Sequence, residues 1–320
     1  EVLSYPPINS LAYLSVYYSQ PEWLVQLWLE CYGAEVTEKL LAYMNRKPLL
    51  TLRVNTLRTD AETLARKFTG EGVRSRPSEL IHDSLVIEAM ETSIDQLDSY
   101  QSGLFYIQNE ASMLAADILD PQEGEHILDL CSGVGGKATH FAEKIKNKGM
   151  INAVELYQHK LSILKNNCQR LGINIIDPEQ NDILTMQAKP EWQRVFLDAP
   201  CSGLGVLNRR ADARWHRTPQ EINELIKLQA ALLEKAGEMT APGGILVYST
   251  CTINPVENEN IILSFLDNNQ AFSLDPFAGL ISYFPLDQKD REMTEKGWLT
   301  IMPGKYGCDG MFYARLRRSI

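Results

Sequence analysis

The sequence predicts an α/β protein in which a small α+β domain precedes a large Rossmann-like, doubly wound sheet. From about Gln108 onward, short apolar runs alternate with amphipathic helical patterns, which is typical of a parallel sheet covered by helices on both faces. The first of these runs leads into a glycine-rich turn and then a helix, as in many open α/β sheets. At 320 residues, the chain is long enough for one large domain and a smaller one.

Residues 1–45 are expected to form a helical linker segment. The stretch after Ser19 has apolar residues at helical spacing, a capping box between Ser19 and Glu22, and Gly33 as its stop. A second helix is expected from there to about Asn45. These patterns predict two helices before the first domain.

Residues 46–107 are expected to form the small α+β domain. The run at 49–54 predicts its first strand. Thr59 with Glu62 predicts the capped start of a helix that stops at a glycine. A further short strand is expected near 80–89.

Residues 108–320 are expected to form the doubly wound domain. Its clearest helix starts at Thr218, where Pro219 occupies the first turn and Glu221 closes a capping box, and it ends before Gly243. Other helices are expected near 137–147, 157–172 and 257–267. Strands are expected near 126–131, 149–156, 174–178, 194–199, 244–250, 298–304 and 311–317.

The composition is typical of a globular protein and indicates neither a membrane protein nor a disulfide-rich one. Hydrophobic residues make up 44% of the chain, and no apolar run reaches the roughly 18 residues that a membrane span needs. The first ten residues lack the basic and apolar regions of a signal peptide, so we expect a cytoplasmic protein. Six cysteines without a C-x-x-C pair argue against zinc, and we expect no metal.

A net charge of -10 gives no bulk attraction to nucleic acid, so any RNA binding would depend on a local basic face. Two arginine clusters qualify. One surrounds Trp215 and contains Arg209, Arg210, Arg214, His216 and Arg217; the other contains Arg315, Arg317 and Arg318. An ordinary solvated surface explains either cluster equally well.

The glycine-rich turn has the spacing of a nucleoside-cofactor loop. Gly133, Gly135 and Ala138 fit the G-x-G-x-x-G/A pattern. Glu155 ends the next strand, where an acid can accept hydrogen bonds from both hydroxyls of a ribose. A P-loop is excluded because Cys131 stands where its first glycine belongs. The pattern alone does not separate NAD from S-adenosylmethionine.

Two acids and two cysteines follow later strands of the same domain. Asp182 comes after the third strand region and Asp198 ends the next, while Cys201 and Cys251 each follow a strand. This set suits methylation of carbon 5 of a pyrimidine, because a thiolate that adds to carbon 6 makes carbon 5 nucleophilic. A carboxyl group such as Asp198 assists at ring nitrogen 3. Neither a dehydrogenase nor an amine methylase needs both cysteines, and the residues alone leave open which one is the nucleophile.

Several short motifs carry a family resemblance. They are DLCSGVGGK, DAPCSGLG, YSTCT, RVNTL, QNEASMLAADIL and GCDGMFYARLRR, with the segment RWHRTPQEI. With them, the chain from about Leu49 to its C-terminus resembles the RNA 5-methylcytosine methyltransferases of the Sun/Nop2 (NSUN) group, and within it the bacterial enzymes of small-subunit ribosomal RNA. The resemblance implies a class I S-adenosylmethionine-dependent methyltransferase domain and an RNA-recognition-like domain before it.

The resemblance also implies roles for the candidate residues. Cys251 would form the covalent adduct with the base and Cys201 would assist release of the product. Asp198 would complete the catalytic centre. S-adenosylmethionine would be bound by the glycine-rich loop and the strand-end acids, which are Cys131, Ser132, Gly133, Val134, Gly135, Gly136, Lys137, Glu155, Asp182 and Asp198.

The chain departs from the family pattern at the cofactor loop and at its N-terminus. The loop lacks the usual proline and is therefore less rigid, and Glu155 stands where aspartate is commoner. Ribosomal members usually carry a helical domain resembling the antitermination factor NusB. We expect that this domain is missing by truncation and that residues 1–45 are the linker that follows it.

The implied substrate is a cytosine in 16S ribosomal RNA, free or partly assembled, methylated at carbon 5. Arg53 and Asn55 of the small domain would help to hold the RNA, as would Arg209, Arg210 and Arg214. We expect a monomer that does not bind membranes. Two alternatives remain: a catalytically idle ribosome-assembly or RNA-binding factor, and a methyltransferase with the same chemistry on transfer RNA.

Overall fold

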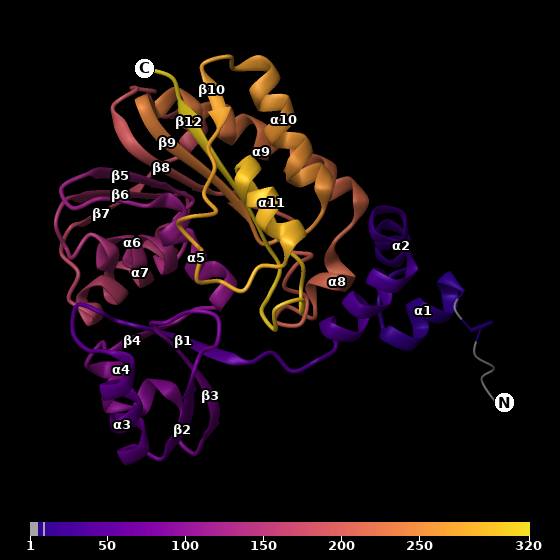
Figure 1. The fold of residues 1–320 in the computed structure, drawn as a ribbon, viewed down its shortest axis with the longest axis horizontal. Helices are drawn as coiled ribbons and strands as arrows, with labels where there is room; N and C mark the ends of the chain where they lie inside the picture. Colours follow the sequence, from indigo (N-terminus) through magenta and orange to yellow (C-terminus); the bar gives the residue numbers. More distant parts are fainter. Residues whose placement is uncertain (1–5, 9) are drawn as a thin grey trace.

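Two sheets organise this protein, whose computed structural model describes residues 6–8 and 10–320. One sheet has four strands and the other has eight. Figure 1 shows the small sheet below the large one, with a pair of N-terminal helices to one side. The expected fold class is therefore confirmed. Residues 1–5 and residue 9, which belong to the expected linker segment, lie outside the described residues.

The N-terminal helices are α1 (Leu11–Tyr18) and α2 (Glu22–Met44). The predicted capping box at Ser19 is wrong: Ser19 has a left-handed backbone and ends α1, and α2 begins after Pro21 without a side-chain cap. The fixed φ of proline is already suited to the start of a helix. The predicted break at Gly33 is confirmed, since a φ of 76° interrupts the helical backbone of α2 there.

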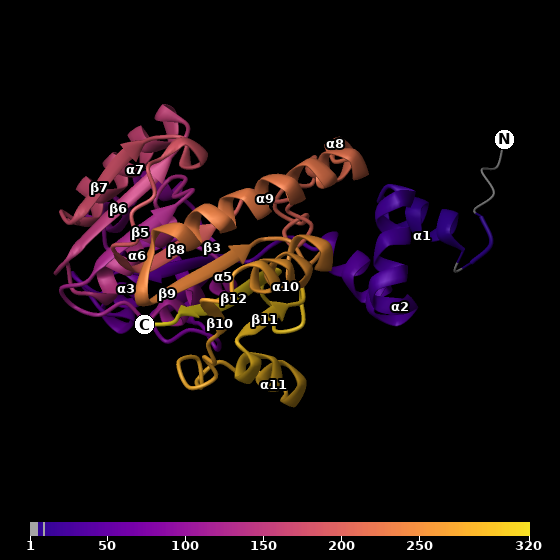
Figure 2. The same ribbon diagram turned by 90° about the horizontal axis from the view of Figure 1, so that it is seen from above.

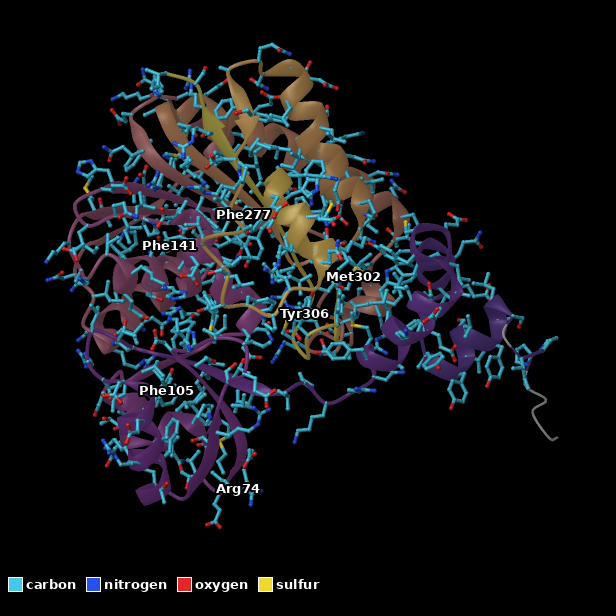
Figure 3. The ribbon with its side chains drawn as sticks, in the orientation of Figure 1. Arg74, Phe105, Phe141, Phe277, Met302 and Tyr306 are labelled. Atoms are coloured by element: carbon cyan, nitrogen blue, oxygen red, sulfur yellow. The ribbon has the colours of Figure 1, made fainter. Side chains whose placement is uncertain are left out.

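The small sheet is antiparallel and packs its own core, in which the rings of Phe68 and Phe105 are 5.4 Å apart (Figure 3). Its helix is capped by Asp60 rather than by the expected Thr59, because the Asp60 carboxylate accepts a hydrogen bond from the Thr63 N–H at 2.8 Å. The strand order is β2-β3-β1-β4. The elements are β1 (Leu50–Val54), α3 (Ala61–Gly70), β2 (Val73–Pro77), β3 (Ser84–Met90), η1 (Ile94–Gln96), α4 (Asp98–Gln101) and β4 (Phe105–Ile107).

The large sheet is parallel at its centre and antiparallel at one side. Its parallel strands are β5 (His126–Leu130), β6 (Met150–Glu155), β7 (Ile176–Gln180), β8 (Trp192–Asp198) and β9 (Thr240–Thr250); β10 (Phe272–Leu274), β11 (Trp298–Ile301) and β12 (Met311–Arg318) add antiparallel pairs. The order is β10-β12-β9-β8-β5-β6-β7, with β11 beside β12. The chain runs outward from β5 and then returns to β8 on its other side. The carboxyl ends of β5 and β8 therefore flank a switch point, where open α/β sheets bind ligands.

Helices cover both faces of the large sheet. Figure 2 shows α9 (Pro219–Met239) along one side of the sheet. On the opposite face Ile127 shares a core cluster with Phe141 of α6 (Gly136–Lys144), whereas its neighbour Leu128 belongs to the cluster under α9. Phe141 is labelled in Figure 3. The predicted capping box between Thr218 and Glu221 is confirmed at the start of α9. The helices and short turns are α5 (Glu110–Leu119), α6 (Gly136–Lys144), α7 (Gln158–Leu171), η2 (Ile183–Thr185), α8 (Ala213–His216), α9 (Pro219–Met239), η3 (Pro255–Glu257), α10 (Glu259–Asn268) and α11 (Gln288–Lys296).

The N-terminal helices pack against the loops that follow β8 and β9. Leu24 and Leu41 of α2 share a core cluster with Leu204 after β8 and Ile253 after β9. The hydroxyl of Tyr32 on α2 donates a hydrogen bond to the Ile253 carbonyl. These helices are therefore part of the wall behind the carboxyl edge of the sheet.

Candidate active site

Cys201 and Cys251 lie side by side at the carboxyl edge of the large sheet. Because β8 and β9 are neighbouring parallel strands, with Asp198 in register with Ser249, the turns after them emerge at the same edge. The two Sγ atoms are 3.4 Å apart, within hydrogen-bond distance for sulfur. The two cysteines that the sequence singled out are therefore brought together.

The two thiols differ in their readiness to ionise. A hydrogen bond from Cys201 lowers the pKa of Cys251 against the opposing effects of burial and of the Asp198 charge, and the positive charges of Arg210 and Lys137 lower it further. The same hydrogen bond and burial raise the pKa of Cys201 well above its ordinary value. The site therefore stabilises Cys251, rather than Cys201, as the thiolate, which is the reactive form of a cysteine.

Asp198 and Lys137 form an ion pair near the thiols. Lys137 stands in the first turn of α6, directly after the glycine-rich loop, and contacts one carboxylate oxygen of Asp198. The Ser249 hydroxyl donates to the other oxygen at 2.8 Å. Two donors thus fix a carboxylate whose side chain remains 34% exposed and so accessible to a substrate.

The glycine-rich loop folds into a tight turn that depends on left-handed backbone. Cys131, Gly133 and Gly135 have φ values of 61°, 58° and 87°. At Gly135 an added Cβ would come within 2.8 Å of Cγ of Leu164, so only glycine fits there without a shift. The Gly133 N–H donates to the Glu155 carboxylate at 3.0 Å, which ties the loop to the end of β6.

The residues around this loop suit a nucleoside cofactor. Glu155 accepts hydrogen bonds from the Gly133 and Tyr157 N–H groups and from Lys160, and a carboxylate has about four acceptor positions, so capacity remains for a ribose hydroxyl. Exposed apolar side chains lie beside the strand ends, where an adenine ring needs an apolar contact. They are Val134, Leu156 and Leu184.

Val134 was expected from the sequence, whereas Leu156 and Leu184 were not. The available signal was an apolar residue next to a strand-end acid, because Leu156 directly follows Glu155. Asp182 caps the η2 turn by accepting a hydrogen bond from the Leu184 N–H at 3.0 Å. This hydrogen bond holds Asp182 and Leu184 together at one edge of the site.

Asp129 is a third residue that was not expected from the sequence. It is buried at the end of β5, and within the described part of the chain neither of its carboxyl oxygens has a hydrogen-bond partner. Burial raises its pKa to about 7. Ser132 donates to the backbone carbonyl of Asp129 at 2.8 Å, which ties the backbone of Asp129 to the loop. A buried acid in this position is available to a donor on a bound ligand.

Arg53 and Asn55, expected to hold RNA, instead join the two domains. Arg53 is 1% exposed and forms hydrogen bonds of 3.0 and 2.9 Å with the Glu143 carboxylate. Asn55 is buried and donates to the Leu171 carbonyl at 2.9 Å. Side chains enclosed in this way do not reach RNA, so their expected role is corrected to a structural one.

The arginines around Trp215 differ in accessibility. Arg214 is 6% exposed and donates to the carbonyls of Met44 and Leu207, so its expected RNA contact is also corrected. Arg209 is ion-paired with Asp309. Arg210 is exposed and near enough to Cys251 to lower the pKa of that thiol. Of the three expected RNA contacts in this cluster, Arg209 and Arg210 are both exposed, and Arg209 is the one held in an ion pair.

The C-terminal arginines are engaged within the protein. Arg315 and Arg317 share the carboxylate of Asp275. Arg318 donates to the carbonyls of Gly237 and Thr240. These side chains therefore stabilise the packing of β12 against neighbouring elements.

The described residues meet the requirements of neither a metal site nor a membrane span. No group of three or more His, Cys, Asp or Glu side chains within residues 6–8 and 10–320 is arranged to hold a metal ion. Over the same ranges, no helix is both long enough and apolar enough to cross a membrane.

Two family models match the chain. One, described as 16S rRNA methyltransferase RsmB/F, matches residues 116–317. The other, described as the RsmF/B-like ferredoxin-like domain, matches residues 20–94. Together they cover parts of both sheets.

Known proteins are similar over nearly the whole chain. The probable ribosomal RNA small subunit methyltransferase B of Bacillus subtilis (strain 168) is 35% identical over 94% of this chain and 66% of its own length. The protein of that name from Synechocystis sp. (strain PCC 6803) is 36% identical over 94% of this chain and 67% of its own. This chain thus spans about two thirds of the length of these relatives. The crystal structure of PH0851 matches with a TM-score of 0.89 at 32% identity, covering 99% of this chain and 70% of that one.

Proposed function

This chain belongs to the RsmB/F family of S-adenosylmethionine-dependent 16S rRNA methyltransferases, and from that premise we propose that it methylates carbon 5 of a cytidine in small-subunit ribosomal RNA. The names of its relatives support ribosomal RNA as the substrate. The position of the modified atom rests on the chemistry of the site.

The observation that carries the proposal is the contact between Cys201 and Cys251, 3.4 Å apart at the switch-point edge. Methylation of an amine or a hydroxyl requires no thiol, whereas carbon 5 of cytosine is too weak a nucleophile to react unaided. Two cysteines in contact, one favoured as thiolate and one as thiol, suit a reaction in which a sulfur first adds to the base and later leaves it.

In the proposed first step, the thiolate of Cys251 forms a bond to carbon 6 of the cytosine. The electron pair of the carbon 5–carbon 6 double bond shifts through carbon 4 onto ring nitrogen 3, which takes up a proton from water, and the new N–H donates a hydrogen bond to the carboxylate of Asp198. The product is an enamine in which carbon 5 is nucleophilic. Lys137 holds the Asp198 carboxylate in place as its counter-ion.

The cofactor loop and the acids around it would hold S-adenosylmethionine. When bound, this cofactor supplies the electrophilic methyl group that carbon 5 accepts. Glu155 would accept hydrogen bonds from the ribose, and Val134, Leu156 and Leu184 would contact the adenine. Lys137 connects the two halves of the site, because it follows the loop in sequence and pairs with Asp198.

Release requires the reverse movement of electrons. The proton on carbon 5 passes to water, its electron pair re-forms the double bond to carbon 6, and the carbon–sulfur bond breaks. The leaving group is the Cys251 thiolate, which the thiol of Cys201 stabilises by the hydrogen bond seen between the two sulfurs. Ring nitrogen 3 returns its proton to water, so the site regains its starting state with Asp198 ionised.

The substrate base has to leave its stack to meet Cys251, which favours an unpaired or partly assembled region of RNA. Arg210 is placed to contact a phosphate beside this base, because it is exposed and its charge reaches the thiol. Trp215, 59% exposed on the same segment, offers a flat ring on which a neighbouring base can stack.

The test is a covalent protein–RNA adduct detected on a denaturing gel. Wild type, Cys201→Ala, Cys251→Ala and Cys31→Ala are incubated with small-subunit ribosomal RNA and S-adenosylmethionine. Cys31 is exposed on α2 and serves as the matched control. We expect Cys201→Ala to accumulate adduct, Cys251→Ala to form none, and Cys31→Ala to behave as wild type.

The other outcomes discriminate between alternatives. A reversed pattern for the two cysteine variants would assign the nucleophile to Cys201 and overturn the proposed roles of both residues. Adduct with transfer RNA but not with ribosomal RNA would change the substrate. Absence of adduct from every variant with either RNA would favour an assembly factor without this activity.

A further inference from the structure

Glu257 is a fully buried carboxylate that contacts the loop around Cys201 and the loop after Cys251, together called the cysteine loops. It ends the η3 turn after β9 and is 0% exposed. Within residues 6–8 and 10–320 it forms no ion pair with a Lys, Arg or His side chain. A buried charge without an ion-pair partner is tolerated only where hydrogen bonds satisfy it. The residues that donate these hydrogen bonds therefore identify the segments that the Glu257 carboxylate holds in place.

The donors come from the loops that follow the two cysteines. On the Cys201 side, the N–H and hydroxyl of Ser202 donate to Glu257 at 2.8 and 2.6 Å. On the Cys251 side, the side-chain amide of Asn254 donates to Glu257 at 3.1 Å. One carboxylate therefore holds both loops.

Two further contacts close this network. Ser202 and Thr252 are joined hydroxyl to hydroxyl at 2.8 Å. Gln229 of α9 donates to Glu257 at 3.1 Å and to the carbonyl of Pro200, just before Cys201, at 2.9 Å. The backbone on both sides of Cys201 is thus tied to the same point as the backbone after Cys251.

We propose that Glu257 is a positioning residue that holds the two cysteine loops together and keeps their thiols in contact, an arrangement called the clasp below. Only the consequence of the clasp for catalysis rests on the proposed function. Hydrogen bonds to a carboxylate are stronger and more directional than neutral ones. An apolar side chain in its place would leave the buried donors of Ser202, Asn254 and Gln229 without a partner, which costs stability. The charged group therefore serves the geometry of the loops. Its negative charge also adds to the hydrogen bond and burial that raise the pKa of Cys201.

The variant that tests the clasp is Glu257→Gln, and Glu259→Gln is the matched control. Glu259 is two residues away on α10, and it accepts a hydrogen bond from Thr300 of β11 rather than from either cysteine loop. A glutamine keeps the size of the side chain but presents an NH2 group where an oxygen accepted hydrogen bonds. The loops then lose part of the network while the core volume stays the same.

The first readout needs neither RNA nor cofactor. Diamide oxidises the two thiols to a disulfide: the thiols lose two protons and two electrons, the sulfurs join, and the N=N bond of diamide is reduced to a hydrazine. The linked peptides are quantified by mass spectrometry. Because the rate depends on how often the sulfurs meet, we expect it to fall about tenfold in Glu257→Gln and to be unchanged in Glu259→Gln.

The second readout is the rate of methyl transfer to ribosomal RNA. We expect kcat of Glu257→Gln to fall about a hundredfold, while calorimetry shows the same affinity for S-adenosylhomocysteine as in wild type. A residue that only stabilised the fold would lower both together. Disulfide formation at the wild-type rate in Glu257→Gln would overturn the proposal.

A third variant keeps the test valid if Glu257→Gln does not fold. Ser202→Ala removes one hydroxyl from the network and leaves the carboxylate in place. We expect slower disulfide formation, and a wild-type rate would again contradict the clasp. Slower disulfide formation together with no RNA adduct from Cys201→Ala would leave the role of Glu257 standing and reject the proposed function.

Discussion

Arg53 of the small domain and Glu143 of α6 form a buried ion pair that joins the two sheets, with both side chains less than 3% exposed. The same guanidinium donates to the carbonyl of Gly136 at 2.7 Å. Gly136 precedes Lys137, the partner of Asp198. The contacts between the two domains therefore reach the cofactor loop through Arg53 and Gly136, and the position of the small domain affects the geometry of the site.

The change Glu143→Gln should strongly destabilise the protein at pH 8. It leaves the Arg53 charge buried without its counter-ion, which typically costs about 3–5 kcal/mol. Urea unfolding measures this loss. The matched control is Glu62→Gln, whose ion pair with Arg66 is 82% and 69% exposed; an exposed pair contributes about 0.5 kcal/mol or less. Equal losses of unfolding free energy in the two variants would show that the buried Arg53–Glu143 pair contributes no more to stability than an exposed ion pair.

Gly135→Ala should reduce cofactor affinity more than a loss of stability alone would explain. Its backbone is left-handed and its new Cβ would press on Leu164, so the loop has to move. Gly33→Ala is the control, because Gly33 is also left-handed but has open space around its Cβ position. Each should lose about 1 kcal/mol from backbone strain. Calorimetry with S-adenosylhomocysteine should show weaker binding for Gly135→Ala, and equal binding by both variants would contradict this expectation.

Arg210→Ala should change two separate properties. The pKa of Cys251 is lowered first by the hydrogen bond from Cys201 and further by Arg210. Without this charge the pKa rises, so alkylation of Cys251 by iodoacetamide should shift to higher pH. The slope of log affinity for RNA against log salt should also flatten by about 1.

Lys227→Ala is the control for Arg210→Ala, since Lys227 is exposed on α9. It should leave the alkylation profile of Cys251 unchanged. An unaltered salt slope in Arg210→Ala would remove Arg210 from the RNA interface. An unaltered alkylation profile would show that its charge does not reach the thiol.

Asp129→Asn should gain stability relative to wild type as pH rises from about 4 to 7. Burial raises the folded-state pKa of Asp129 to about 7, whereas an unfolded aspartate ionises near about 3.9. Between these values the unfolded chain binds fewer protons, so wild-type stability falls with rising pH. Denaturant unfolding of both proteins at pH 5 and pH 7.5 tests the sign. A constant difference between them would show that Asp129 does not titrate in this way.

Much of the large domain follows from local sequence patterns. The strand ends that carry Asp198, Cys201 and Cys251, the glycine turn at Gly135 and the capping box of α9 are all set by residues close together in the chain. Short strands with polar residues, such as β2 and β10, lacked such a pattern and were not predicted. The helix cap at Asp60 was misplaced by one residue because two neighbouring side chains can both cap a helix.

The sequence by itself determined the kind of fold, the two cysteines and the loop for a nucleoside cofactor, since each depends on residue type at short spacing. Only the tertiary structure decided which charged residues are available to RNA. It enclosed Arg53 and Arg214 and left Arg210 exposed, and it brought Glu257 between the two cysteine loops. The physical reason is that burial and hydrogen-bond partners depend on segments far apart in the chain, such as Arg53 and Glu143, which no local pattern relates.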